Sequence, residues 1–135
     1  MTRYALSSVT AGYGRGPDVL QGVDLALPEG AVVALLGENG SGKSTLLKAL
    51  ARLLPPRTGT ISFEGRPLAD VSRKDAALAI AYLPQSFEPF FPATALELVL
   101  LGRTPHRAIG APGPRDVRVA RAALEELDAS RLEGV

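Results

Sequence analysis

The sequence predicts an α/β fold, and three consecutive features predict it. An unbroken apolar run over residues 31–36 is typical of a strand that is covered on both faces of a parallel sheet. A glycine-rich stretch over residues 37–42 follows directly. From this point leucines recur at helical spacing, at Leu46, Leu47, Leu50, Leu53 and Leu54. A buried strand joined by a tight loop to a helix is a building unit of α/β proteins.

Short β segments are expected on both sides of this unit. Residues 4–10 are compatible with an edge strand, and residues 23–27 alternate apolar and other side chains as a half-buried strand does. Residues 60–64 alternate in the same way. The run over residues 80–83 predicts a short strand that Pro84 ends.

Helix boundaries are predicted from prolines and capping residues. The prolines at 55–56 end the first helix, because proline lacks the amide donor and restricts the residue before it. Residues 72–79 are a helix candidate whose first residue, a serine, can act as the cap. Thr94 and Glu97 form a capping box for a helix that extends to residue 101. A last amphipathic helix is expected over residues 115–127.

Length and composition exclude several classes of protein. The 135 residues suit one domain, and a formal net charge of +1 argues against nucleic-acid binding through overall charge. The absence of cysteine excludes a disulfide framework and a thiolate metal site. We find neither a signal-peptide pattern nor an apolar stretch that could span a membrane. We therefore expect a cytoplasmic protein that reaches a membrane only through a partner.

The glycine-rich stretch matches the phosphate-binding motif G-x-x-x-x-G-K-[ST] in full, over Gly37, Glu38, Asn39, Gly40, Ser41, Gly42, Lys43 and Ser44. Inward-facing backbone amides at a helix N-terminus bind the closely spaced charges of a triphosphate. The three glycines allow positive φ angles and close approach. We expect ATP and Mg²⁺ as ligands: Lys43 would reach the β- and γ-phosphates, Ser44 would ligate Mg²⁺, and Thr45 would bond to phosphate. A glycine loop that merely connects a strand to a helix is the alternative.

Several segments resemble those of ABC ATPases, in the family's order and over nearly the whole chain. The run G-E-N-G-S-G-K-S-T-L-L is similar to the family's Walker A motif. Residues 11–14 and 19–25 look like its N-terminal β subdomain, and residues 56–65 look like the strand that follows the P-loop helix. The sequence Tyr-Leu-Pro-Gln at residues 82–85 resembles the Q-loop.

The resemblance implies an α/β P-loop NTPase core of the ABC type, with an N-terminal antiparallel β subdomain and the start of a helical subdomain. The expected parts are residues 1–30 and 56–70 for the β subdomain, 31–55 and 76–85 for the P-loop core, and 86–135 for the helical subdomain. The L-S-G-G-Q signature, the Walker B strand and the switch histidine do not occur in these 135 residues. We therefore expect the N-terminal part of one ABC ATPase domain, incomplete and poorly stable by itself, which binds ATP without hydrolysing it.

The resemblance also assigns roles outside the P-loop. Tyr13 would stack on the adenine ring, and a loop aromatic that covers the sheet edge is the alternative. Gln85 would meet Mg²⁺ or the attacking water, and its loop would sense the membrane partner; its residue type alone favours a surface glutamine. The expected catalytic residues are thus Lys43 and Gln85, and the expected metal ligands are Ser44 and Gln85.

Residues 101–106 are similar to a stretch in ATPases of iron-siderophore, haem and cobalamin importers. This resemblance implies transmembrane permease subunits, a homodimer of ATPase subunits and, indirectly, an external substrate-binding protein, at the inner face of the cell membrane. The aromatic loop of Phe87, Phe90 and Phe91 either receives a permease helix or packs internally. His106 is expected to be a solvated loop residue. Most of a cluster of five arginines is expected to form a solvated face: Arg103, Arg107, Arg115, Arg118 and Arg121.

Three other interpretations stay open. A soluble ABC protein acting on nucleic acid would show a basic excess or a long coiled coil, and neither is present. A small kinase or GTPase would lack the placements of Tyr13 and Gln85, and a GTPase would need an N-K-x-D motif, which is absent. A non-enzymatic remnant would differ from the importer subunit only in its activity.

Overall fold

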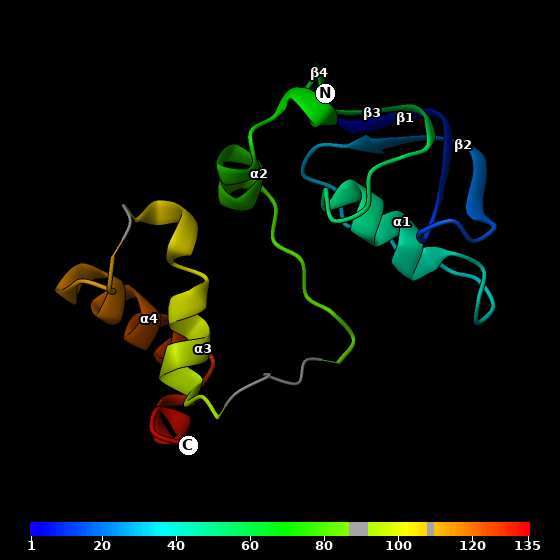
Figure 1. Cartoon of the computed structure of the whole chain (residues 1–135). Coiled ribbons are helices and arrows are strands. Elements are labelled where there is room, and N and C mark those ends of the chain that lie inside the picture. Colours follow the sequence, from blue (N-terminus) through cyan, green and yellow to red (C-terminus); the bar gives the residue numbers. More distant parts are fainter. Residues whose placement is uncertain (87–91, 108–109) are drawn as a thin grey trace. The chain divides into compact units, whose positions relative to one another are not determined.

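The computed structural model describes residues 1–86, 92–107 and 110–135 (Figure 1). It divides into two units, Met1–Tyr82 and Leu83–Val135, which are described separately.

The first unit contains an antiparallel sheet of four strands in the order β2-β1-β3-β4. The strands are β1 (Thr2–Gly12), β2 (Asp18–Pro28), β3 (Thr58–Phe63) and β4 (Arg66–Pro67). In the register, Leu6 lies opposite Leu25 on β2 and opposite Ile61 on β3. β1 is therefore an interior strand, and the prediction of an edge strand over residues 4–10 is wrong. That prediction failed because strand order depends on distant partners, which a short mixed segment does not reveal.

Helix α1 (Lys43–Leu50) packs against the sheet and closes the core of this unit (Figure 1). Its buried side chains meet apolar side chains of β1 and β3, among them Leu6, Val9, Ile61 and Phe63. The helix ends at Leu50, before the predicted stop at the two prolines, and Leu47 and Leu53 of the expected stripe are exposed. Each fully buried leucine in such a core contributes about 1.5–3 kcal/mol. The helix is thus held to the sheet by a narrower stripe than the sequence predicts.

The predicted strand over residues 31–36 is wrong in this structure, and so is the one over residues 80–83. Both segments lack regular structure, and Leu36 is 88% exposed. A strand needs a neighbour for its backbone amides and carbonyls, and no segment of the described residues pairs with either one. The parallel sheet that the apolar run predicts is accordingly not formed within residues 1–86, 92–107 and 110–135.

The predicted N-caps of two helices, at Ser72 and Thr94, are confirmed. Helix α2 (Arg73–Ala79) begins at the predicted cap, where the Asp75 amide donates to Ser72 Oγ at 3.0 Å. Helix α3 (Ala95–Leu101), in the second unit, has the predicted capping box. In that box the Thr94 amide donates to Glu97 Oε2 at 2.8 Å.

The second unit pairs α3 with helix α4 (Pro114–Glu126). Ala120 and Leu124 are buried in α4, as expected for the apolar side of an amphipathic helix. The end of the chain returns to α3, where the Ala95 amide donates to the Val135 carbonyl at 2.9 Å. Arg121 of α4 reinforces this return through an ion pair with Glu133 at 2.7 Å.

Candidate functional site

The glycine loop leads directly into α1 and is shaped by its glycines. Gly40 and Gly42 have φ angles of 85° and 93°, as predicted, and Gly42 is the N-cap of the helix. The prediction is wrong for the φ angle of Gly37, which is not in the positive region. The predicted close approach to the Gly37 backbone is confirmed, because a Cβ on Gly37 would lie 2.8 Å from Ser41 Oγ. The loop therefore leaves a cradle that side chains would fill, and this suits a phosphate group.

The ammonium group of Lys43 lies within reach of this loop. Its Nζ donates to the carbonyl oxygen of Gly37 at 2.7 Å and to that of Glu38 at 2.5 Å. A longer contact of 3.4 Å reaches Ser41 Oγ. An ammonium group has three donors, so these three oxygens hold the Lys43 charge at the loop. The next side chain, Ser44, is exposed in the first turn of the helix.

Tyr13 meets α1 from the loop between β1 and β2. Its hydroxyl group lies 3.2 Å from Thr45 Oγ1, and Thr45 is almost fully buried. The Lys48 ammonium lies 5.2 Å from the centre of the Tyr13 ring, a cation–π contact. The hydrogen bond with Thr45 is the main cause that lowers the pKa of Tyr13; burial opposes it, and Lys48 adds to the lowering. The ring is still 46% exposed, so it lies beside the P-loop helix with surface available for a ligand.

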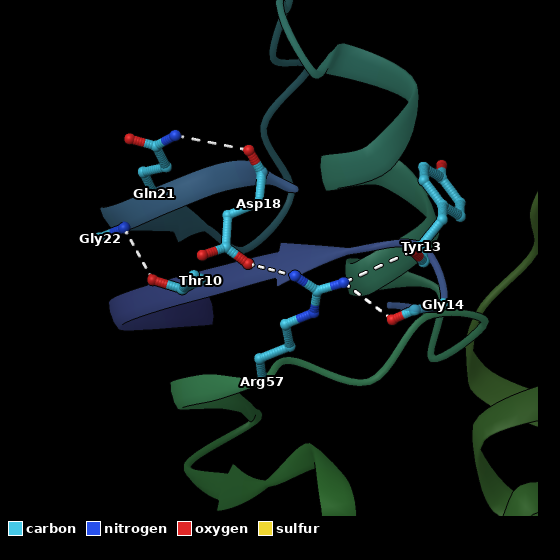
Figure 2. A network of polar contacts seen from close by, with 7 residues as sticks. All are labelled: Thr10, Tyr13, Gly14, Asp18, Gln21, Gly22 and Arg57. Atoms are coloured by element: carbon cyan, nitrogen blue, oxygen red, sulfur yellow. Dashed lines mark hydrogen bonds and ion pairs between the residues drawn. The ribbon is translucent and has the colours of Figure 1, made fainter. Parts of the chain in front are cut away.

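Arg57 was not singled out from the sequence, although it organises the loop that carries Tyr13 (Figure 2). Its Nη1 lies 2.5 Å from Asp18 Oδ1, and its Nη2 donates to the Gly14 carbonyl at 2.9 Å. A longer contact of 3.5 Å reaches the Tyr13 carbonyl. No sequence signal could have identified this residue, because its position depends on the pairing of β1 with β3.

The remaining predicted site residues lie in the second unit. Gln85 is exposed, and its role stays a prediction. Phe87, Phe90 and Phe91 lie outside the described residues. His106 is exposed, as predicted, at the end of a 3-10 turn.

The prediction that most of the five arginines are solvated is confirmed, because Arg115, Arg118 and Arg121 are exposed. Arg103 donates from Nε to Asp116 Oδ1 at 3.2 Å, and its side chain is mostly buried. Arg121 pairs with Glu133. Two of the five arginines therefore stabilise the second unit through carboxylates.

The helices formed within residues 1–86, 92–107 and 110–135 all fall short of the length and apolar character that a membrane span requires. In the same part of the chain, no three His, Cys, Asp or Glu side chains are grouped as they would be around a metal ion.

A P-loop at the start of a helix, packed under an antiparallel sheet, defines a P-loop nucleotide-binding domain of the ABC class. Residues 20–133 match the family described as ABC transporter, and the chain belongs to that family.

Among curated relatives, the chain is 44% identical over 125 residues to a hemin import ATP-binding protein, HmuV, of Burkholderia ambifaria. This match covers 86% of the chain and 46% of the relative. A hemin import ATP-binding protein of Myxococcus xanthus is 42% identical over 119 residues, which are 88% of the chain and 44% of the relative. The chain thus spans about half the length of the curated relatives it matches.

Solved structures confirm the predicted fold class as part of an ABC ATPase cassette. A dimeric ATP-binding cassette in a post-hydrolysis state, bound to ADP and Pi, is 26% identical with a TM-score of 0.80. That match covers 97% of the chain and 60% of the cassette. An ABC transporter described as of metal-chelate type, in an inward-facing conformation, is 27% identical with a TM-score of 0.71. The match covers 99% of the chain and 49% of that structure.

Proposed function

We propose that this chain forms the ATP-binding part of an ABC importer that couples ATP binding and hydrolysis to the uptake of haem or a related iron-siderophore or cobalamin compound. The observation that carries the proposal is the position of Lys43. Its ammonium group donates to the Gly37 carbonyl oxygen at 2.7 Å, beside the N-terminus of the helix that follows the P-loop. Tyr13 lies against the same helix, where a base can stack on it. The names of the relatives, hemin import ATP-binding proteins, support the direction of transport and the kind of cargo.

Different residues at the glycine loop would contact different parts of Mg-ATP. Lys43 would exchange its carbonyl partners for β- and γ-phosphate oxygens, and Ser44 would ligate Mg²⁺. Thr45 has one donor and two acceptor positions, so it can accept from Tyr13 and still donate to phosphate. When bound, Mg²⁺ offsets negative charge on the phosphate oxygens. Tyr13 would stack on adenine, a contact of about 1–3 kcal/mol.

The remaining roles belong to the complete domain. Gln85 would contact Mg²⁺ or the attacking water, and its loop would respond to binding of the membrane partner. The β subdomain would be residues 1–30 and 56–70, the P-loop core residues 31–55 and 76–85, and the helical subdomain would start at residue 86. The partners would be transmembrane permease subunits, a second ATPase subunit and, through the permease, an external binding protein. This places the protein at the inner face of the cell membrane, with no role for nucleic acid.

The proposal is tested by titrating the chain with Mg-ATP in a calorimeter. We expect Lys43→Ala to weaken binding about 10-fold or more, because charge-assisted hydrogen bonds contribute about 1.5–3 kcal/mol. Lys74→Ala is the matched control, because it removes an exposed lysine from α2 in the same unit. Equal loss in the two variants, or no binding by the unchanged chain, would contradict the proposal.

A further inference from the structure

Arg57 joins the two ends of the loop that carries Tyr13. This loop, residues 13–17, connects β1 to β2, whose ends pair through Gly12 and Asp18. One guanidinium nitrogen of Arg57 lies 2.5 Å from Asp18 Oδ1, after the loop. The other donates to the Gly14 carbonyl at 2.9 Å, at the start of the loop (Figure 2).

The backbone around Arg57 fixes the position of its side chain. The Arg57 amide donates to the Thr10 carbonyl of β1 at 2.8 Å, so the residue is held where β3 begins. Gly12 makes room for the guanidinium group, since a Cβ there would lie 3.2 Å from Arg57 Cζ. The same Cβ would lie only 2.5 Å from the Pro17 carbonyl oxygen, so the loop closes tightly over this glycine.

The two contacts of residue 57, with Asp18 and with the Gly14 carbonyl, depend more on the planar shape of the guanidinium group than on its positive charge. The side chains of Arg57 and Asp18 are 31% and 39% exposed, and a pair at that exposure contributes little through charge alone. A planar guanidinium group can reach a carboxylate and a carbonyl on two sides at once. A lysine ammonium on a flexible stem cannot hold both ends in one plane.

We propose that Arg57 is a positioning residue for the base of the nucleotide: it holds residues 13–17 so that the Tyr13 ring stays beside α1. Arg57 itself touches neither the Tyr13 ring nor the glycine loop in the contacts described above. Its effect therefore falls on recognition of the base and leaves recognition of the phosphates unchanged. This inference rests on the proposed binding of ATP at the P-loop.

The test compares Mg-ATP with Mg-tripolyphosphate, which has the phosphates without the base, by calorimetry on the 135-residue chain. Tyr13→Ala should weaken ATP about 5- to 150-fold, the equivalent of a stacking contact of about 1–3 kcal/mol, and leave tripolyphosphate unchanged. Arg57→Ala should weaken ATP about 3- to 10-fold if the loop then adopts the binding conformation about 10–30% of the time. Tripolyphosphate should again be unchanged.

Further variants separate positioning from charge and from loss of structure. Arg57→Lys and Asp18→Asn should both weaken ATP in the same selective way, and Asp18→Asn keeps the side-chain shape. Arg15→Ala removes an exposed charge from the same loop and should bind ATP as the unchanged chain does. Adding Arg57→Ala to Tyr13→Ala should cause no further loss.

Each outcome decides between the two proposals. If the unchanged chain binds neither ligand, the proposed function itself is wrong. If Tyr13→Ala weakens the binding of ATP selectively while Arg57→Ala and Asp18→Asn do not, the positioning role is wrong and the proposed function stands.

If Arg57→Ala and Asp18→Asn also weaken the binding of tripolyphosphate, their role is a general structural one and the positioning role is wrong. If Arg15→Ala weakens ATP binding as much as Arg57→Ala does, the effect is one of charge. If Tyr13→Ala leaves ATP binding unchanged, the base contact fails and the positioning role fails with it.

Discussion

Strand β1 has a mixed sequence and residues 31–36 are apolar throughout, yet it is β1 that forms the core of their common unit. Val9 of β1 is fully buried and its strand is paired on both sides, whereas Leu36 is 88% exposed in a segment without regular structure. By hydrophobicity alone, residues 31–36 are the better candidate for a core strand. The difference shows that an apolar run becomes a strand only where neighbouring strands satisfy its backbone.

The largest expected effect comes from removing a core side chain on β3, the strand that pairs with β1. Phe63 of β3 is 4% exposed and packs on Tyr4, with 4.9 Å between the ring centres. We expect Phe63→Ala to lower the free energy of unfolding by about 3–5 kcal/mol. Leu36→Ala is the matched change in residues 31–36, and it should cost less than about 0.5 kcal/mol because the side chain is already exposed. Denaturant unfolding measures both, and equal costs would mean that residues 31–36 are packed.

A smaller effect is expected from acid, and it concerns the second unit. The Thr94 amide, and then the Thr94 hydroxyl, hold the pKa of Glu97 below its ordinary value of about 4.3. The Gly113 amide, with Arg103 adding to it, likewise holds the pKa of Asp116 below its ordinary value of about 3.9. Both groups therefore stabilise the folded state above these values, and the stabilisation is lost as the pH falls through their lowered pKa values.

Helix content followed by circular dichroism during acid titration checks this expectation. Helix content should fall as the pH is lowered below about 4, and Glu97→Gln should make the loss less steep. Glu126→Gln, at an exposed position near the end of α4, is the control and should leave the titration unchanged. The same titration in Glu97→Gln and in the unchanged chain would contradict the role of the capping box.

The features predicted correctly from the sequence are those set by residues close together in the chain. The caps at Ser72 and Thr94 join side chains to amides three residues away, and the phosphate-binding motif is one continuous run. The missed strand over residues 31–36 and the missed role of Arg57 concern partners distant in the sequence. Residues 31–36 need neighbouring strands, and the contact of Arg57 with Asp18 needs the register of three strands. Local chemistry can be inferred from one segment, whereas pairing cannot.

Hydrogen exchange of the chain with and without Mg-ATP measures strand pairing and nucleotide binding at the glycine loop in one experiment. We predict slow exchange for β1 amides and fast exchange for residues 31–36. We also predict that Mg-ATP slows exchange over residues 37–45 in the unchanged chain but not in Lys43→Ala. Slow exchange of residues 31–36 without ligand would contradict the comparison of the two segments. Unchanged exchange over residues 37–45 at saturating Mg-ATP would contradict the nucleotide site.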